Sequence, residues 1–395
     1  MEERTGLPVV AMVGGGQLAR MTHQAAIALG QSLRVLALSA DEPAALVTPD
    51  VVIGDHRDLD ALRRAAEGAE ALTFDHEHVP GDLLEKLVAE GVTVHPGPEA
   101  LRHAQDKLVM RRRLAELGEP VPPFAPVTAA AEVEAFAGEH GWPVVLKAVR
   151  GGYDGRGVWM PDSPEEAART VPELLEAGTP LMVEQKVALR RELAVVLARS
   201  PYGQAAVYPT VETVQVDGIC TDVLAPAPGL PEDAAEAAEE LAIRIAAALG
   251  VVGLLAVELF ETPDGRVLVN ELAMRPHNSE HWSMDGAVTS QFEQHLRAVL
   301  DYPLGSTAPL RPACVMANVL GGDPFPSTGT DERLHHTLAR FPEARVHLYG
   351  KAERPGRKIG HVNITGDDMD DARRRARLAA DHLATGVWTD GWSSH

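Results

Sequence analysis

Short apolar segments alternate with helical ones over residues 8–94, and this alternation constrains the fold more than any other feature. Apolar runs predict strands at Pro8–Val13, Leu33–Leu38, Val51–Ile53, Ala71–Phe74 and Val92–Val94. Helical spacing lies between them, at Gln17–Leu29, Asp58–Ala66 and Leu83–Ala89. Strands separated by helices pair in parallel through right-handed crossovers, so we expect a doubly wound α/β domain.

The pattern changes after residue 98, and we expect two further units. Glu99–Leu117 reads as one helix, and the proline-rich Pro120–Pro126 is suited to neither a helix interior nor a central strand. Strands at Val144–Ala148 and Leu181–Glu184 flank a helix in a small α+β unit. From Arg191 onward several strands follow without helices, which predicts an antiparallel sheet. The predicted domains are residues 1–98, 99–188 and 189–395.

Composition excludes several classes of protein. The formal net charge of −21 argues against a general binder of nucleic acid or anionic membranes, because phosphate contacts need lysine and arginine. Gly250–Phe260 is the most apolar run, but it is too short to span a bilayer and Glu258 interrupts it. No signal peptide is expected. The two cysteines, Cys220 and Cys314, predict free thiols in a cytoplasmic protein.

Two glycine-rich segments are candidate anion sites. Gly14–Gly16 separates the first strand from the first helix, where backbone N–H groups are free; tight packing of strand on helix is the alternative. Arg150–Gly157 has four glycines in eight residues, and Lys147 precedes it on an apolar strand. A lysine there is costly unless it meets an anion, so this segment favours phosphate binding over a plain flexible hairpin.

A pair of glutamates forms a candidate metal site. If Asp264-Gly265 is a two-residue turn, Glu258 and Glu271 are directly opposite each other, since each lies six residues from the turn. Like charges in that position destabilise a sheet, and a divalent cation such as Mg²⁺ would relieve the repulsion. Asn270 offers a further oxygen. Protonation of one glutamate, or pairing with arginine, is the alternative.

Three polar segments remain. The dense polar run Glu271–Trp282 predicts an active-site loop, and Pro276 argues against a zinc-binding helix there. Lys351–Lys358 has four cations in eight residues, which suits a phosphate monoester or a plain solvated turn. Asp75–His78 follows a strand end, the usual ligand edge of such sheets.

These segments, in this order, resemble the ATP-grasp superfamily, and within it the 5-(carboxyamino)imidazole ribonucleotide synthetase family. The resemblance spans nearly the whole chain. It is carried by GGGQLARM at Gly14–Met21, QDK at Gln105–Lys107, GGYDGRG at Gly151–Gly157, VEQ at Val183–Gln185, VNELAMRPHNSEHW at Val269–Trp282, SQFEQHLRA at Ser290–Ala298 and RPGRKIGHVN at Arg354–Asn363.

The resemblance implies a role for each matching residue. It implies an ATP site, with Glu184–Val187 contacting adenine and Glu192 the ribose. The implied ATP contacts are Lys107, Lys147, Gly152, Tyr153, Asp154, Gly155, Arg156, Gly157, Val158, Glu184, Gln185, Lys186, Val187, Glu192, Gln215, Asn270 and Glu271. Mg²⁺ would be held by Glu258, Glu271 and Asn270. Gln17, Glu77, Arg275, Lys351, Arg354 and Arg357 would bind the ribonucleotide, and Arg275, His277 and Lys147 would be catalytic.

The implied fold is an ATP-grasp α/β architecture, with a small α+β lid and a larger α+β C-terminal domain. The implied reaction joins bicarbonate to aminoimidazole ribonucleotide through carboxyphosphate, with ATP cleaved to ADP and phosphate, in a homodimer. A formate-dependent glycinamide ribonucleotide transformylase is the nearest rival. The chain departs from the family pattern at Gln215, where histidine is frequent, at Glu280, where glycine is usual, and at His76 and His78.

Overall fold

The computed structural model describes residues 6–152, 156–322 and 326–392. Its N-terminal unit is a four-stranded sheet of order β3-β2-β1-β4, and the predicted parallel pairing is confirmed. The strands are β1 (Val9–Val13), β2 (Ser32–Ala37), β3 (Asp50–Ile53) and β4 (Ala71–Phe74), and the helices are α1 (Gln17–Ala28), α2 (Leu59–Ala66) and α3 (Gly81–Ala89). The predicted strand at Val92–Val94 is wrong: Val94 makes only a single parallel bridge to Leu72.

The connector to the next unit is two helices rather than the predicted one. These are α4 (Pro98–Gln105) and α5 (Lys107–Glu116). Asp106 separates them in an extended conformation, and its carboxylate accepts the N–H of Val109 at 2.9 Å. A side-chain cap of this kind starts a new helix. The break places Lys107 at the first turn of α5.

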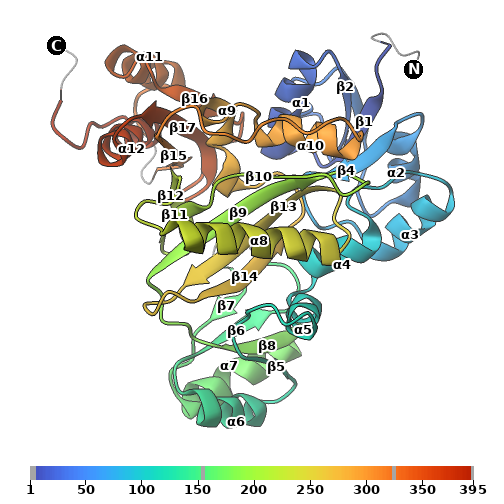
Figure 1. Cartoon of the computed structure of the whole chain (residues 1–395), viewed down its shortest axis with the longest axis vertical. Coiled ribbons are helices and arrows are strands. Elements are labelled where there is room, and N and C mark those ends of the chain that lie inside the picture. Colours follow the sequence, from blue (N-terminus) through green and yellow to red (C-terminus); the bar gives the residue numbers. More distant parts are fainter. Residues whose placement is uncertain (1–5, 153–155, 323–325, 393–395) are drawn as a thin grey trace.

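The lid is an antiparallel sheet of order β5-β8-β6-β7 covered by two helices, α6 (Ala130–His140) and α7 (Pro164–Glu176). Figure 1 shows it as a separate lobe at the bottom of the molecule. Its strands are β5 (Phe124–Val127), β6 (Val144–Ala148), β7 (Val158–Trp159) and β8 (Leu181–Gln185). Pro126 lies on β5, an edge strand, where a missing N–H costs no hydrogen bond of the ladder.

The third unit is a nine-stranded antiparallel sheet of order β14-β13-β9-β11-β12-β15-β17-β16, with β10 beside β9. Its strands are β9 (Arg191–Arg199), β10 (Ala205–Val207), β11 (Val211–Val216), β12 (Ile219–Ala225), β13 (Gly253–Glu261), β14 (Val267–Ala273), β15 (Ala313–Leu320), β16 (Arg345–Leu348) and β17 (Lys358–Gly366). The helices are α8 (Glu232–Ala248), α9 (Ser283–Gly286), α10 (Gln291–Val299), α11 (Thr330–Arg340) and α12 (Met369–Thr385), with a 3₁₀ turn at Asn278–Glu280. The expected antiparallel sheet is confirmed.

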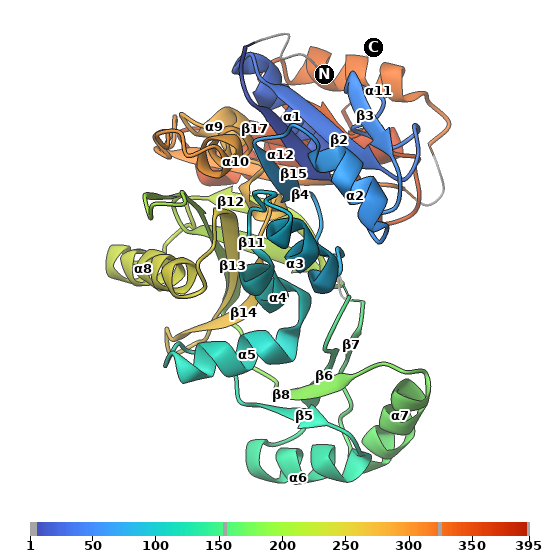
Figure 2. The ribbon, with the colours of Figure 1, turned by 90° about the vertical axis from the view of Figure 1, so that its right-hand side faces the viewer.

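One apolar core joins the N-terminal unit to the central sheet. Val13 and Phe74 of the parallel sheet, Met110 of α5 and Leu272 of β14 belong to the same buried cluster. The lid has its own core around Val133 and Leu146. Figure 2 shows the lid projecting from the rest of the chain, connected mainly through α5 and the strands around β8. No helix of the described residues is long and apolar enough to cross a membrane.

Candidate active site

The carboxyl edge of the parallel sheet is built around a buried carboxylate, Asp75. A Cβ on Gly14, whose φ is +109°, would lie 1.6 Å from Asp75 Oδ1, so this position requires glycine. The N–H of Gly16 donates to Asp75 Oδ2 at 2.7 Å. Burial raises the pKa of Asp75 to about 6, against the effect of that hydrogen bond. The carboxylate of Asp75 therefore occupies the N-terminus of α1, where a bound anion was expected. Tight packing against Asp75 explains the glycines.

The same edge carries Gln17 and Glu77, the residues expected to face the ribonucleotide. Gln17 begins α1, and Glu77 lies two residues beyond Asp75; both side chains are half-buried. Glu77 Oε2 accepts from Arg275 Nε at 2.8 Å. Burial alone would raise the pKa of Glu77, but the charge and hydrogen bond of Arg275 hold it below the ordinary value. The loop after β14 thus reaches the N-terminal unit, as an active-site loop would.

His277 connects that loop to the central sheet. Its Nε2 lies 3.2 Å from Glu258 Oε1, and its Nδ1 lies 2.8 Å from Ser279 Oγ. Gln291, fully buried at the start of α10, holds the His277 backbone from both sides: Oε1 accepts its N–H at 2.7 Å, and Nε2 donates to its carbonyl at 2.9 Å. We did not single out Gln291 from the sequence, although it lies in the quoted run SQFEQHLRA.

Glu258 and Glu271 are cross-strand partners, as predicted, but not through the predicted turn. Near the turn Glu261 pairs with Val267, so the connection is a five-residue loop rather than two residues. A bulge between Glu258 and Leu259 leaves Asn270 as the extra residue on β14, and this restores the expected pairing. The bulge also turns Asn270 toward the site, where its Nδ2 donates to Glu258 Oε2 at 3.4 Å.

The carboxylates of Glu192, Glu258 and Glu271 differ in the charged groups that surround them. Lys107 Nζ donates to Glu271 Oε1 at 2.6 Å. Burial would raise the pKa of Glu258, but the hydrogen bond and charge of His277 lower it below the ordinary value. Burial and then the charge of Glu258 raise the pKa of Glu192 to about 7. Without ligands, the site is therefore partly neutralised by its own cations.

A buried polar cluster joins the lid to the central sheet. Glu184 of β8 accepts from Arg111 Nε at 2.5 Å and lies 2.7 Å from Lys147 Nζ of β6. Lys147 also donates to Asn270 Oδ1 at 3.0 Å, and Arg111 Nη2 donates to the Asn270 carbonyl at 2.6 Å. Burial lowers the pKa of Lys147 below its ordinary value, although Glu184 opposes this. Arg111 was missed because an arginine in a charged helix carries no sequence signal.

The glycine-rich segment connects β6 to β7, and its described part requires glycine. Gly152 and Gly157 have φ values of +85° and +74°, and a Cβ on Gly152 would lie 2.5 Å from the Arg156 carbonyl oxygen. Arg156 is exposed, and Val158 pairs with Lys147. The expected contacts Tyr153, Asp154 and Gly155 lie outside the described residues.

The remaining expected ATP contacts lie at the end of β8, in the residues that follow it, and on β11 of the central sheet. Gln185 ends β8, and its N–H donates to the Pro123 carbonyl at 3.0 Å. Lys186 is exposed and Val187 is half-buried. Gln215 lies at a bulge on β11, opposite Cys220. The contact of these residues with ATP stays a prediction.

The basic segment 351–358 approaches the site from the C-terminal unit. Lys351 exerts its charge on Asp75, and Lys358 exerts its charge on Glu258. Arg357 Nη1 donates to the Ala352 carbonyl at 3.2 Å, and Arg354 is exposed. The fold thus brings this basic segment to the edge of the parallel sheet where Gln17 and Glu77 lie. This position favours a phosphate-binding role over a plain solvated turn.

The donor set fits magnesium better than a transition metal. Within the described ranges, no group of three or more His, Cys, Asp or Glu side chains is placed to hold a metal ion. Mg²⁺, however, is usually held by one or two carboxylates plus phosphate oxygens and water. Glu258 and Glu271, with side chains 34% and 38% exposed, meet that requirement together with the Asn270 amide.

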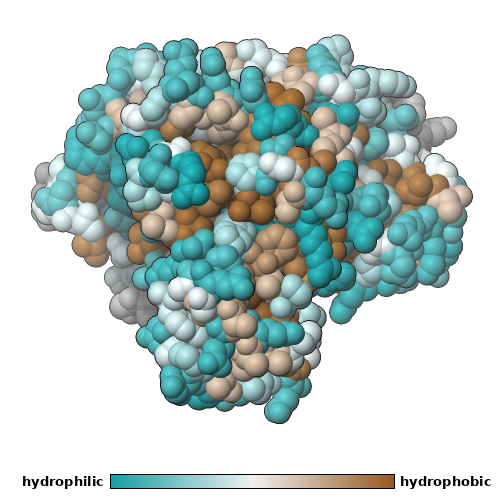
Figure 3. Space-filling view, turned by 60° about the horizontal axis from the view of Figure 1, so that its bottom comes forward, coloured by the Kyte–Doolittle hydropathy of each residue, from teal (hydrophilic) through white to brown (hydrophobic). Residues whose placement is uncertain are grey.

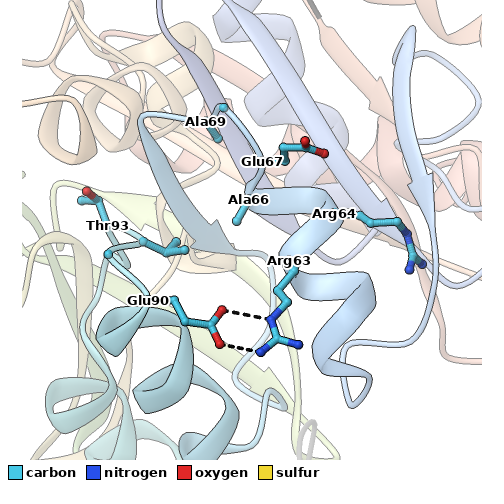
Figure 4. Close-up of a pocket in the computed structure, with 10 residues that line it drawn as sticks. Arg63, Arg64, Ala66, Glu67, Ala69, Glu90 and Thr93 are labelled. Atoms are coloured by element: carbon cyan, nitrogen blue, oxygen red, sulfur yellow. Dashed lines mark hydrogen bonds and ion pairs between the residues drawn. The ribbon is translucent and has the colours of Figure 1, made fainter.

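An open pocket of about 530 Å³ lies away from this site. It is lined by residues that include Arg63, Glu67, Glu90 and Thr93, at the amino edge of the parallel sheet. Figure 4 shows an Arg63–Glu90 ion pair at its border. The candidate site lies at the opposite edge, where the three units meet.

Figure 3 shows apolar residues gathered in the middle of the face from which the lid projects, bordered by hydrophilic ones.

Comparison with known proteins assigns a family. Residues 7–105 match the ribonucleotide synthetase preATP-grasp domain, residues 112–292 the ATP-grasp domain, and residues 314–375 the phosphoribosylaminoimidazole carboxylase C-terminal domain. The N5-carboxyaminoimidazole ribonucleotide synthase of Mycobacterium tuberculosis is 64% identical over 388 residues, 98% of this chain and 90% of the relative.

Two solved structures agree. The N5-carboxyaminoimidazole ribonucleotide synthetase of Thermus thermophilus has a TM-score of 0.84 at 37% identity, over 98% of this chain and 100% of its own. The N5-carboxyaminoimidazole synthase of Aspergillus clavatus, in complex with ADP and aminoimidazole ribonucleotide, has a TM-score of 0.85 at 32% identity, over 95% and 98%. The chain therefore belongs to the N5-carboxyaminoimidazole ribonucleotide synthase family of ATP-grasp enzymes.

Proposed function

We propose that this protein carboxylates 5-aminoimidazole ribonucleotide with bicarbonate, using ATP, and releases N5-carboxyaminoimidazole ribonucleotide, ADP and phosphate. The observation that carries the proposal is the junction of three units at one site. Lys147 of the lid, the Glu258–Glu271 pair of the central sheet and Glu77 of the N-terminal unit are linked through Asn270, His277 and Arg275. Such a junction suits a reaction in which a nucleotide, a small anion and an amine must meet.

The nucleotide is assigned to the junction of the lid with the central sheet, where Lys147 meets Asn270. Lys107 and Lys147 offer positive charge to the β- and γ-phosphates, and the glycine-rich segment offers backbone N–H groups. Glu184–Val187 is assigned to adenine, with the backbone as the expected contact because the Glu184 carboxylate is already held by Arg111 and Lys147. Glu192 is assigned to the ribose hydroxyls.

Magnesium is assigned to Glu258 and Glu271, with the Asn270 amide beside them. When bound there, it would neutralise phosphate charge and lower the cost of attack on the γ-phosphorus. Lys107 and His277 would then lose their present carboxylate partners. The Lys107 ammonium group and the His277 ring would become available to the phosphates and to the incoming anion.

The acceptor ribonucleotide is assigned to the edge of the parallel sheet. Gln17 and Glu77 would face its base, and Lys351, Arg354 and Arg357 would take its 5′-phosphate. Arg275, which already contacts Glu77, lies between the acceptor and the metal strand. The acceptor amine and the γ-phosphate are thereby held on opposite sides of one small space.

The chemistry proceeds in two steps. A bicarbonate oxygen attacks the γ-phosphorus, the bond to the β-phosphate oxygen breaks, and ADP leaves carboxyphosphate behind. Carboxyphosphate then releases phosphate and carbon dioxide, and the acceptor amine forms the new C–N bond and loses a proton. Arg275, His277 and Lys147 hold the anions together and stabilise their spread charge. Lid closure excludes the water that would hydrolyse carboxyphosphate.

A formate-dependent glycinamide ribonucleotide transformylase remains the second candidate, because the ATP and metal residues serve both reactions. The experiment is ADP release by the purified protein with bicarbonate plus aminoimidazole ribonucleotide, compared with formate plus glycinamide ribonucleotide. We expect stimulation only by the first pair. Stimulation only by the second pair would refute the proposal.

Two finer assignments belong to the same proposal. We place the enzyme in the cytoplasm, where its purine substrates are made, and we expect a homodimer. Sedimentation equilibrium at micromolar concentration checks the second: a mass near twice 42.2 kDa supports it, and a single-chain mass refutes it.

A further inference from the structure

We infer that Arg111 is a positioning residue that fixes the phosphate-binding lysine of the lid and the metal-binding strand in one shared geometry. The inference deepens the proposed nucleotide site and rests on that assignment. Arg111 lies on α5, between the N-terminal unit and the lid, and its side chain is 1% exposed.

The contacts of Arg111 close a ring. Arg111 Nε binds Glu184 Oε1 at 2.5 Å, and Lys147 Nζ lies 2.7 Å from the other oxygen, Oε2. Lys147 Nζ also donates to Asn270 Oδ1 at 3.0 Å. Arg111 Nη2 donates to the Asn270 backbone carbonyl at 2.6 Å, which completes the ring. The ring therefore joins α5, β8, β6 and β14, which belong to the connector, the lid and the central sheet.

Each contact restricts a group that the nucleotide needs. Because Arg111 takes one carboxylate oxygen of Glu184, Lys147 is bound to the other and is shared with Asn270. Two of its three ammonium N–H groups are used in this way, and the third is the one we assign to a phosphate oxygen. The planar guanidinium donates to two acceptors at a fixed angle, which a lysine in its place cannot do.

The second arm of Arg111 acts on the metal strand. Asn270 is the bulged residue, and the bulge is what brings Glu271 opposite Glu258. A bulge interrupts the ladder, so its carbonyl needs another donor. Arg111 is that donor. One side chain thus sets the phosphate contact and the metal pair together, without touching either ligand.

A purely structural role predicts something different. A buried ion pair whose loss only loosens the fold would lower thermal stability and leave nucleotide constants unchanged in the protein that remains folded. Arg34 provides the matched control. It is also buried, pairs with Asp50 at 3.0 Å and donates to two backbone carbonyls, those of Ala65 and Glu67, but it lies in the N-terminal unit away from the nucleotide residues.

The test compares Arg111→Gln, Arg111→Lys and Arg34→Lys with the parent by isothermal titration calorimetry, using ADP with and without Mg²⁺. We expect each Arg111 variant to weaken MgADP binding by about 10–100-fold, the usual effect of losing a group that orients metal ligands. The loss should be smaller for ADP alone. Arg34→Lys should leave both constants within about twofold, even if its melting temperature falls. Should Arg111→Gln fail to fold, Arg111→Lys carries the test because it keeps the charge.

Steady-state constants add a second readout. The KM for ATP should rise in Arg111→Lys, while the KM for the ribonucleotide should stay at the parent value. The inference is wrong if folded Arg111→Lys binds MgADP like the parent, or if Arg34→Lys weakens it equally. A parent protein that binds MgADP but does not carboxylate would refute the proposed function and leave this inference standing.

Discussion

Replacing Glu280 by glutamine removes a carboxyl group from a fully buried position in the active-site loop. Glu280 ends the 3₁₀ turn of the active-site loop, is fully buried, and both of its oxygens lack a hydrogen-bond partner among the described residues. Its electrostatic neighbours include Tyr208 and Cys314, members of the apolar cluster around Trp282. Burial raises the pKa of Glu280 well above its ordinary value of 4.5, and a weaker polar interaction with the Trp282 side chain opposes the rise.

The sign of the pH dependence follows from linkage. Above pH 4.5 the unfolded chain loses this proton and the folded chain keeps it, so the free energy of unfolding falls as pH rises toward the folded pKa. The slope is about 1.4 kcal/mol per pH unit. If the folded carboxyl stays protonated to pH 7, the loss between pH 5 and pH 7 is about 2.5 kcal/mol. Glu280→Gln has no titratable group at this position, so its free energy of unfolding lacks this contribution to the pH dependence.

Urea unfolding of parent and Glu280→Gln at several pH values measures the effect. Other titrating groups are common to both proteins and cancel in the difference. We expect the glutamine variant to gain stability relative to the parent as pH rises from 5 to 7, while Glu134→Gln, at an exposed position of α6, shows no such gain. A difference between parent and Glu280→Gln that stays constant with pH would refute the argument.

Three further outcomes are expected. Glu271→Gln should abolish ADP release, because it removes a metal-binding charge while keeping the shape; activity near the parent level would show that the pair is not the magnesium site. Gly14→Ala should destabilise the fold far more than Gly68→Ala in thermal melts. Both glycines have positive φ, but only the first has a carboxylate in the way, so equal melting temperatures would contradict the packing argument. Burial raises the pKa of the Cys314 thiol, so a thiol reagent should modify it only after unfolding, and rapid labelling of native Cys314 would contradict its burial.

Local patterns predicted the fold well where each segment forms its own structure. The parallel sheet follows from apolar runs separated by amphipathic helices. Strand β5 was not predicted, although its place at the edge of a sheet agrees with the exclusion of Pro120–Pro126 from central strands. The break between α4 and α5 was missed, although Asp106 is a typical helix-capping residue. Helix α6 was not identified, because its alanine-rich sequence lacks a strong apolar face.

The site was predicted less completely, for a physical reason. The opposition of Glu258 and Glu271 was confirmed, but a longer turn and a bulge at Asn270 compensate for each other, which spacing cannot show. Family motifs identified Lys147 and Glu184 and gave no hint of Arg111. Contacts between residues distant in sequence depend on how the lid sits on the sheet, and no local pattern encodes this.

The most direct test of the central claim follows oxygen atoms from bicarbonate. If bicarbonate attacks the γ-phosphorus of ATP at this site, ¹⁸O-labelled bicarbonate must leave one labelled oxygen in the inorganic phosphate formed with aminoimidazole ribonucleotide. Mass spectrometry of that phosphate reads the result. We predict one ¹⁸O per phosphate, after correction for exchange of bicarbonate with water; unlabelled phosphate formed together with the carboxylated product would contradict the account.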